Sequence, residues 1–582
     1  MTRVIALQHL WLILQLESVA PLPPVASSPR SLSPDTVTCK GERVSRIDIH
    51  RRPPFEVTGN SIWKRALRYG TRQHVTTKEI IIRRFLALQV GDRCTELRRA
   101  ESERILRGQP FLADAGIVAI PDGSGGVVVD VSTVDEASLI LDGVASAKSP
   151  HIRGVRVGDA NLFGDATYVV GKWNYGRPFR DAYWGKISDY QFLGRPYQFA
   201  VWGGRREIGG DWAMEASHPF LTDLQRVSWR TTAGSDAGFF YFLRPGADPD
   251  AVRLNRNYAD IGGVVRIGPP GGRLALVGGS ISHEAEDPGA SPLILSGANL
   301  IPDTTTALMN RFRYRRSTRL NALWGLRTVR FVRVSGFDAL EGAQDVRTGV
   351  QMSTLLGKGI KGLHGQDDDF FTSSDIYAGM GTRWAFAAVD ISAEGRRALS
   401  SSWDGVLAHG RAAVYLKPIP RHTVMTDLTW SAGWKQRVPF QVTLEDREGG
   451  IRGFSNSDIG GARRMVAHIE DRYVAGRISQ IASVGLGAFV DVGKLWAGDA
   501  PLGVNSPLSV GAGFSLLAAV PPRSQRMWRV DLAFPVRGAL GKRRRWEVRF
   551  SNSDFTRLFR REPGDVYSSR ERSVPSSVFN WP

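Results

Sequence analysis

Apolar and polar residues alternate in short runs from residue 143 to residue 555, and Gly, Pro, Asp and Asn separate the runs. Between residues 508 and 516, every even position is apolar and every odd position is small or polar. Residues 528–534 repeat the pattern, with Arg529 and Asp531 on the polar side. A period of two is typical of a β-strand with one face toward an apolar medium and the other toward water. The pattern predicts a mainly β domain.

A soluble β-sandwich and a membrane β-barrel both produce this alternation. Three features favour the barrel. The domain lacks helical periodicity, it holds most of the 16 Trp residues, many near strand ends, and it carries Glu, Arg and Asp on the polar face at mid-strand. Interfacial aromatic girdles and a watery lumen account for such positions. We therefore predict a transmembrane antiparallel β-barrel over residues 143–555.

Residues 42–136 have a different texture. Thr76 or Thr77 is expected to cap a helix, with Glu79 as the capping-box partner. The predicted elements are a strand at 46–50, helices at 80–88 and 95–107, and a hairpin of strands at 115–120 and 127–134. This order predicts a small α+β domain, interrupted by an insertion at 51–75.

The N-terminus carries a short apolar segment, residues 4–16. It is too short to span a bilayer as a helix, and its flanks are typical of a signal peptide at 1–20; the alternative is an N-terminal tail. Residues 21–41 are rich in Pro and Ser and indicate a linker. The two cysteines, Cys39 and Cys94, could form a disulfide or remain two thiols, and spacing alone does not choose between these states.

The formal net charge is +19, which suits contact with lipid phosphates but also fits a general preference for arginine. Basic residues are spread along alternating strands, which disfavours a nucleic-acid-binding domain. The sequence has no nucleophile elbow, no His-Glu-x-x-His and no phosphate loop, and Asp367 to Asp369 indicate an exposed acidic loop. We therefore expect a protein that is not an enzyme and that uses no cofactor or metal.

A glycine-rich loop at 447–462 carries the main candidate residues of the site, Gly450, Arg452, Gly453 and Phe454. Five predicted strands follow Phe454, at residues 464–473, 482–493, 507–517, 526–536 and 545–554. In the first two of these strands, the apolar alternation places Glu470, Arg472, Phe489 and Asp491 on the face toward the lumen.

This facing predicts that the loop folds into the lumen. Arg452 should then reach Asp491, with Glu470 as a second carboxylate, because a guanidinium fork suits a bidentate carboxylate partner in a partly dry cavity. The flanking glycines permit positive φ at the loop tip. Phe454 is expected to pack on lumen residues such as Phe489.

One constellation of residues resembles the signature of the BamA/TamA superfamily of outer-membrane assembly and secretion barrels, the bacterial surface antigen family. It consists of the segment 449–454, Gly460-Gly461, Glu470 with Arg472, and Phe489 with Asp491 and Gly493. The resemblance implies a barrel of about 16 strands with this loop between strands eleven and twelve. Five strands would then follow the loop, which matches the count made from the alternation.

The resemblance extends upstream. Residues 42–136 are similar to a single POTRA domain, and Asn161-Leu162-Phe163-Gly164 is similar to the family's lead into the first barrel strand. It implies a bacterial outer-membrane protein, with the POTRA-like domain in the periplasm, that assembles, inserts or translocates other proteins. The implied partners are unfolded outer-membrane or secreted clients, outer-membrane lipid including lipopolysaccharide, and periplasmic chaperones or accessory proteins.

The C-terminus departs from the family pattern. Family barrels end on an aromatic residue, whereas here the last alternating strand, with Trp546, Val548, Phe550 and Phe555, precedes a further basic segment. We expect that strand to close the barrel and residues 556–582 to form a disordered tail.

Two other functions fit the sequence. A dedicated pore similar to two-partner secretion transporters is one, although those proteins carry two POTRA modules and an N-terminal plug helix. A passive porin or ligand-binding barrel is the other.

Overall fold

The computed structural model describes residues 36–55, 75–145, 152–176, 179–289, 291–297, 299–305, 307–362, 365–366, 368–398, 402–446, 449–454, 457–479, 481–538, 545–553, 562–572 and 576–579. The expected signal peptide, most of the expected linker and most of the 51–75 insertion lie outside these residues. Within the described ranges, no helix has the length and apolarity needed to cross a membrane.

A four-stranded sheet in the order β2-β1-β4-β3 forms the small domain, with two helices packed on it. Strand β1 runs parallel to β4, and the other two pairings are antiparallel. The elements are β1 (Lys40–Arg52), α3 (Glu79–Phe85), β2 (Arg93–Thr95), α4 (Glu96–Arg107), β3 (Leu112–Pro121) and β4 (Val127–Asp135). Apart from the short strand β2, which was not predicted, the strand and helix order is the one expected from the sequence.

Helix α3 starts differently from the expectation. Its N-cap is Lys78, without a side-chain hydrogen bond to the helix, so the predicted Thr-Glu capping box is wrong. The hydroxyl of Thr77 instead accepts a hydrogen bond from the Asn161 amide at 2.8 Å, and its backbone N–H donates to Asp135 at 2.7 Å. The Thr77 hydroxyl is therefore bonded to a residue outside the helix and does not cap α3.

A disulfide joins Cys39 to Cys94, across 55 positions of sequence. Both residues are buried in the core of the small domain, among Ile82, Leu106 and Val129. Closing a chain segment of this length restricts the unfolded state and stabilises a domain by about 4 kcal/mol.

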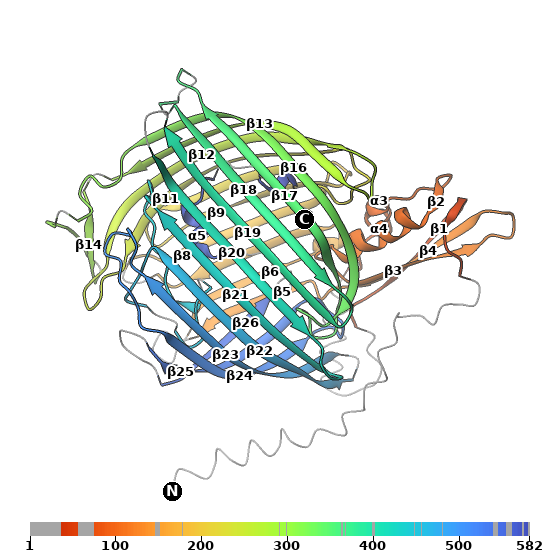
Figure 1. Cartoon of the computed structure of the whole chain (residues 1–582). Coiled ribbons are helices and arrows are strands. Elements are labelled where there is room, and N and C mark those ends of the chain that lie inside the picture. The colour runs from red at the N-terminus through yellow and green to blue at the C-terminus, as the bar shows by residue number, and fades with distance from the viewer. Residues whose placement is uncertain are drawn as a thin grey trace, which may run out of the picture.

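The second unit is a closed antiparallel barrel, which forms the large ring of strands in Figure 1. Its strands are β5 (Leu139–Ala145), β6 (Ile152–Asp159), β7 (Thr167–Asn174), β8 (Ala182–Phe192), β9 (Tyr197–Arg205), β10 (Gly210–His218), β11 (Val227–Phe242), β12 (Asp250–Ile267), β13 (Leu274–Pro288), β14 (Leu293–Ser296), β15 (Asn299–Pro302), β16 (Arg315–Ser335), β17 (Ala343–Gly359), β18 (Asp369–Gly381), β19 (Ala385–Ala398), β20 (Trp403–Leu416), β21 (His422–Trp434), β22 (Arg463–Ile478), β23 (Ala482–Trp496), β24 (Ser509–Ala519), β25 (Met527–Arg537) and β26 (Glu547–Ser553). A 3₁₀ turn, η1 (Leu162–Gly164), links β6 to β7.

The barrel is larger than expected. In the described ranges it has about 20 strands, since β14 and β15 form only a short hairpin, so the prediction of about 16 is wrong in number. The five strands predicted after the loop are β22 to β26. The extra strands lie upstream, where tight turns such as 193–196 and 206–209 join neighbouring strands.

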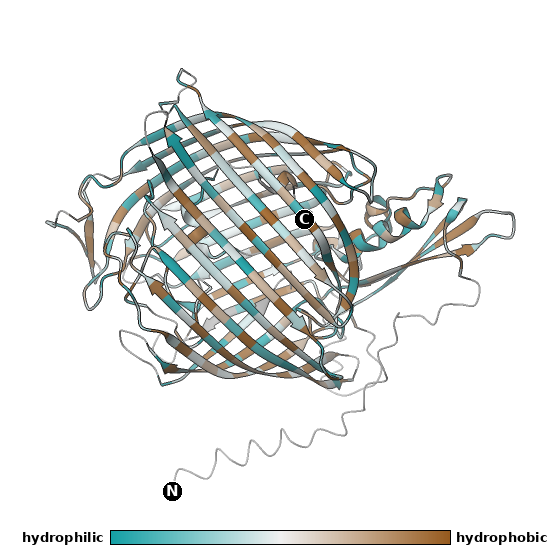
Figure 2. Cartoon of the chain, in the orientation of Figure 1, coloured by the Kyte–Doolittle hydropathy of each residue, from teal (hydrophilic) through white to brown (hydrophobic). Residues whose placement is uncertain are grey.

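Side chains alternate between the two faces of the barrel wall, as Figure 2 shows by hydropathy. On β16, Leu320 and Trp324 are exposed on the outer face, whereas Arg319 and Arg327 are buried on the inner one. Trp324 is exposed within β16, whereas four other exposed Trp side chains, at positions 384, 403, 434 and 546, lie at strand ends or directly beside them. An apolar outer face with tryptophans at the strand ends is the surface of a transmembrane barrel.

The strand predicted to close the barrel is the last one in the ring. β26 lies between β25 and β5, and the side chains of Val548 and Phe550 are exposed on it. Trp546, also exposed, directly precedes β26, and Phe555 lies outside the described residues.

The C-terminal segment is ordered in its described part, contrary to the prediction of a disordered tail. It forms α5 (Gly564–Ser569) and η3 (Ser576–Phe579), and Val566, Val578 and Phe579 are buried. Figure 1 shows α5 within the ring of strands. Its basic residues, which suggested a solvated tail, meet acidic groups on the inner wall.

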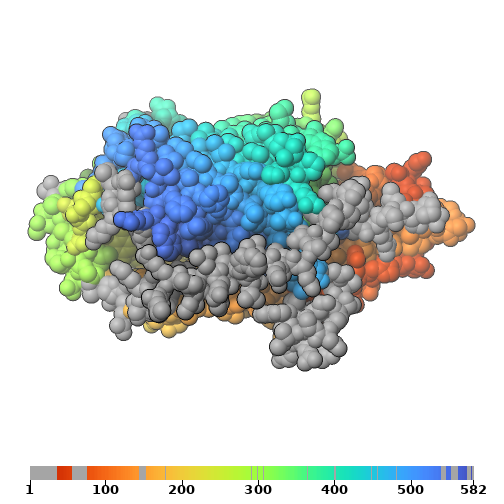
Figure 3. All heavy atoms as spheres, turned by 90° about the horizontal axis from the view of Figure 1, so that it is seen from below, coloured from red at the N-terminus to blue at the C-terminus, as the bar shows by residue number. Residues whose placement is uncertain are grey.

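The small domain protrudes from one end of the barrel, as the space-filling view shows (Figure 3). Arg107 of α4 forms a two-pronged ion pair with Asp345 of β17, with both distances at 2.8 Å. Glu136, just after β4, accepts one bifurcated hydrogen bond from the Ser524 hydroxyl in the β24–β25 turn, with the Ser524 Oγ 2.8 Å from each carboxylate oxygen. The two units therefore share a polar interface at the barrel rim.

This interface should depend on pH through Glu136. Burial raises the pKa of Glu136 from its ordinary value of 4.5 to about 6, although Arg526 and Ser524 act in the opposite direction. Because the folded-state pKa is the higher one, the stabilisation is complete below pH 4.5 and is lost as the pH rises through 6. We expect a loss of roughly 2 kcal/mol in the free energy of unfolding between these limits.

The measurement is urea denaturation of the small domain in detergent at pH 4.5 and 7.5, for the wild type and for Glu136→Gln. The difference in unfolding free energy between the two proteins should change with pH by the stated amount. Parallel pH dependences would contradict the assignment to Glu136.

Candidate functional site in the barrel lumen

The loop that joins β21 to β22, residues 435–462, is termed the latch loop. It is folded on itself by an antiparallel bridge between Val442 and Gly461 and by a bridge between Glu445 and Ile451. Gly450 is required by this fold, because a β-carbon there would lie 2.1 Å from the Leu444 carbonyl oxygen. Gly453 has a φ of 91°, a conformation that favours glycine. The sequence at the tip therefore sets the path of the loop.

Arg452, at the tip of the latch loop, binds Asp491 of β23 through three hydrogen bonds. Its guanidinium Nε and Nη2 donate to the two carboxylate oxygens at 2.7 and 2.6 Å, and its backbone N–H donates at 3.0 Å. Asp491 is fully buried and Arg452 is 7% exposed. This is the bidentate pairing expected from the strand facing.

Glu470 of β22 receives three arginines. Arg452 donates to it at 2.6 Å, Arg472 at 2.6 Å, and Arg529 of β25 at 2.6 and 3.0 Å. A buried carboxylate is costly unless it is paired and hydrogen-bonded, and here both oxygens are saturated. Glu470 therefore connects the latch loop to two strands of the barrel wall.

Phe489 lies beneath the Arg452 guanidinium, which is 3.6 Å from the ring centroid. The contact is a cation–π interaction that also shields the ion pairs from water. Because the guanidinium covers this ring, Phe454 packs elsewhere, in a buried group of residues termed the latch cluster. The latch cluster comprises Leu407, Phe440, Val442, Leu444, Ile451, Phe454, Ile459, Val466, Leu495 and Val566.

Arg472 extends the site to another part of the barrel. Its guanidinium donates to the carbonyl oxygens of Phe337 and Asp338, at 2.9 and 3.2 Å, in the turn between β16 and β17. That turn lies at the barrel end nearer the small domain. The network therefore runs from the latch loop through Glu470 to the opposite rim.

Two members of the network were not predicted as part of the site. Arg529 was recognised only as a residue on the polar face of its strand. His468, whose Nδ1 lies 2.9 Å from Asp491, is on the same face of β22 as Glu470 but was given no role. Strand facing could have nominated both residues. The distance between β22 and β25 around the curved wall could not be read from the sequence.

The electrostatics of the latch favour its charged form. Burial lowers the pKa of Arg452, but the hydrogen bonds and charges of Asp491 and Glu470 raise it above its ordinary value. Arg452 therefore stays protonated at any physiological pH. The ion pairs of Arg452 therefore hold the latch loop in place.

Among the described residues, no group of three or more His, Cys, Asp or Glu side chains could hold a metal ion.

Comparison with known proteins finds no matching family model and no matching curated protein. Among solved structures, BamA from Haemophilus ducreyi lacking POTRA domains 1–3 is similar at 12% identity, covering 87% of this chain and 84% of that chain, with a TM-score of 0.36. CdiB from Escherichia coli is similar at 12% identity, covering 94% and 96%, with a TM-score of 0.38. CdiB from Acinetobacter baumannii is similar at 11% identity, covering 82% and 74%, also with a TM-score of 0.38. Likeness at this level decides neither family nor function.

Arg452→Ala should release the latch loop. Glu470 would keep Arg472 and Arg529, but buried Asp491 would lose both guanidinium bonds and keep only His468 and the backbone N–H of residue 452. Breaking a buried ion pair costs about 3–5 kcal/mol. Protease cleavage within residues 447–462 should therefore become faster on the order of a hundredfold in intact cells.

Asp491→Asn in the same chain should restore part of the protection, because it removes the uncompensated charge. Arg411→Ala is the matched control, since Arg411 pairs with Asp427 within the wall at 2.7 Å. Unchanged cleavage and unchanged function in Arg452→Ala would rule out a latch.

Proposed function

We propose that this chain is an outer-membrane protein of the BamA/TamA type that assembles, inserts or translocates other proteins at the bacterial outer membrane. The observation that carries the proposal is the latch: Arg452 on a glycine-rich loop, clamped in the lumen by Asp491 and Glu470. The resemblance in the sequence implies this loop, and the contacts agree with it. The proposed action is mechanical and involves no covalent chemistry.

The second support is an edge strand of the small domain, and we propose that this domain is a single POTRA-like module in the periplasm. β3 is an edge strand of the sheet. The carbonyl oxygens of Ile117 and Ala119 point outward from it, because they accept from Arg99 at 2.6 Å and from the Val37 N–H at 2.9 Å. An edge of this kind can add an extended peptide by backbone hydrogen bonding.

A cleft of about 830 Å³ lies beside this edge, between the small domain and the barrel rim. Residues of α4, β3 and β16 line it, among them Leu97, Val118 and Phe331. A client strand added to β3 would therefore lie next to the barrel. Val37 already pairs with Ala119 at one position of this edge. An incoming strand would therefore pair beside Val37 or displace it.

The proposed partners are unfolded outer-membrane or secreted proteins, with lipid of the outer membrane, including lipopolysaccharide, around the barrel. The exposed apolar wall suits that lipid, and the net charge of +19 suits its phosphates. Chaperones or accessory proteins of the periplasm could deliver clients to the small domain.

Depletion of the protein, followed by quantitative profiling of the outer-membrane proteome, tests the proposal. Loss of many barrels is the expected result for a general assembly factor, and loss of a single protein would indicate a dedicated transporter. Loss of none would contradict both roles and favour a passive porin.

Ala119→Pro tests the edge strand. Proline removes the outward N–H at this position and leaves the inward hydrogen bonds to β4, so strand addition should fail while the domain still folds. Assembly of client proteins should fall toward the level of the depleted strain. Ala119→Gly, which keeps the N–H, is the control, and equal assembly by the two variants would argue against strand addition at β3.

A further inference from the structure

The described part of the C-terminal segment, residues 562–572 and 576–579, is termed the lumenal tail. It follows the last strand of the barrel but pairs with no strand of the sheet. Its residues contact β22 on one side of the lumen and β16, β17 and β19 on another. A segment with such contacts lies across the interior of the barrel.

The first contact of the lumenal tail is with the latch region. Asp565 of α5 accepts from the Arg464 guanidinium of β22 at 2.7 and 3.2 Å. Val566, fully buried, packs in the latch cluster with Ile451 and Phe454. One end of α5 is thus fixed against the latch loop.

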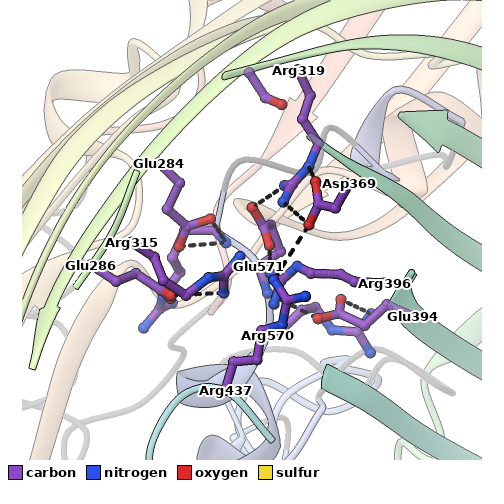
Figure 4. A network of polar contacts seen from close by, with 12 residues as sticks. Glu284, Glu286, Arg315, Arg319, Asp369, Glu394, Arg396, Arg437, Arg570 and Glu571 are labelled. Atoms are coloured by element: carbon purple, nitrogen blue, oxygen red, sulfur yellow. Dashed lines mark hydrogen bonds and ion pairs between the residues drawn. The ribbon is translucent and has the colours of Figure 1, made fainter. Parts of the chain in front are cut away.

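The centre of the lumenal tail carries alternating charge, and Figure 4 shows the wall groups that meet it. Arg570 pairs with Glu394 at 3.4 Å. Glu571 lies between two wall arginines, accepting from Arg319 at 2.5 Å and pairing with Arg396. A positive, negative, positive sequence on the tail therefore faces a complementary set of charges on the wall.

The wall also recognises the backbone of the lumenal tail. Arg256 of β12 donates to the carbonyl oxygens of Ser568 and Arg570, the latter at 2.9 Å. Glu284 of β13 accepts from the Arg572 N–H at 3.2 Å. Hydrogen bonds to main-chain groups hold an extended segment in one register, as peptide-binding sites do.

The last described residue of the tail is an apolar anchor. The ring of Phe579 lies against Gly325 of β16, where a β-carbon would come within 3.1 Å of it. The Phe579 carbonyl oxygen accepts from Arg327 and from Gln351, the latter at 3.3 Å. The wall has no side chain at the point where the ring packs.

The balance of these contacts is polar. The buried apolar side chains of the lumenal tail are Val566, Val578 and Phe579, and the remaining contacts given above are ion pairs and hydrogen bonds. Water or another charged segment can replace such partners, whereas the strand pairing of the barrel does not depend on them. A barrel of about 20 strands also encloses more space than its wall side chains can fill.

We propose that the barrel lumen is a binding site for an extended segment of Arg-Glu-Arg type with an aromatic anchor, and that the chain's own C-terminal segment occupies it as a removable plug. The plug closes the lumen at rest. The plug is released when water or a passing segment replaces Glu571 as the partner of Arg319 and Arg396. The inference concerns the pore alone and does not rest on the proposed function.

Conductance in planar lipid bilayers tests the plug in the absence of any client. The full chain should show a small conductance, and deletion of residues 562–582 should raise it several-fold. A synthetic peptide of residues 562–582 added to the deleted chain should return the conductance to the small value. The same peptide with Glu571→Arg should not, because it would place a third cation beside Arg319 and Arg396.

The charge reversal can also be made in the full chain, which covers the case in which the deleted chain fails to insert. Glu571→Arg should raise the conductance several-fold, and adding Arg396→Glu should lower it again. Asp427→Arg is the matched control, because Asp427 is a buried lumenal acid that pairs with Arg411 of the wall. It should leave the conductance unchanged.

Two results would overturn the plug. One is a full-chain Glu571→Arg protein whose conductance equals that of the wild type. The other is a chain lacking residues 562–582 that conducts more than the full chain but on which the wild-type peptide has no more effect than the Glu571→Arg peptide. Either result could be obtained while the depletion experiment still showed loss of client proteins, so the two proposals fail separately.

Discussion

Charged side chains inside a wide barrel need partners, which here come partly from the wall and partly from two inserted segments. Strand facing directs Glu470, Asp491, Arg319 and Arg396 into the lumen, and all four are almost completely buried. A buried charge is tolerated only when it is paired and hydrogen-bonded. The wall supplies some of these partners, and the latch loop and the lumenal tail supply the others, Arg452 and Glu571. The electrostatics of the wall therefore favour the filling of the lumen.

The two inserted segments are not independent. Val566 of the tail belongs to the same buried cluster as Ile451 and Phe454 of the latch loop. Arg464 joins them by donating both to the Thr443 carbonyl oxygen and to Asp565. Movement of the tail would therefore expose part of the apolar support of the latch, which couples the state of the pore to the position of the loop.

The parts of the site that could be predicted are those that depend on strand facing. The alternation around Asp491 and Glu470 placed both carboxylates in the lumen, and the glycines beside Arg452 indicated a loop able to reach them. Arg529 was not predicted, because its contact with Glu470 depends on the distance between β22 and β25 around the curved wall. Phe454 packs on lumen residues, as predicted, but on those of the latch cluster and not on Phe489, because the Arg452 guanidinium covers the ring of Phe489.

The sequence by itself determined the class of fold, the facing of the strands and the pairing of Arg452 with Asp491. Each of these follows from local rules: the period of two along a strand, the conformational freedom of glycine and the match between a guanidinium and a carboxylate. Only the tertiary structure decided the number of strands, the disulfide of the small domain and the burial of the C-terminal segment. These depend on distances between residues far apart in the chain. The tail shows the reason most clearly. The charges of Arg570, Glu571 and Arg572 can be satisfied by water or by opposite charges in a lumen, and the sequence alone does not distinguish these two environments.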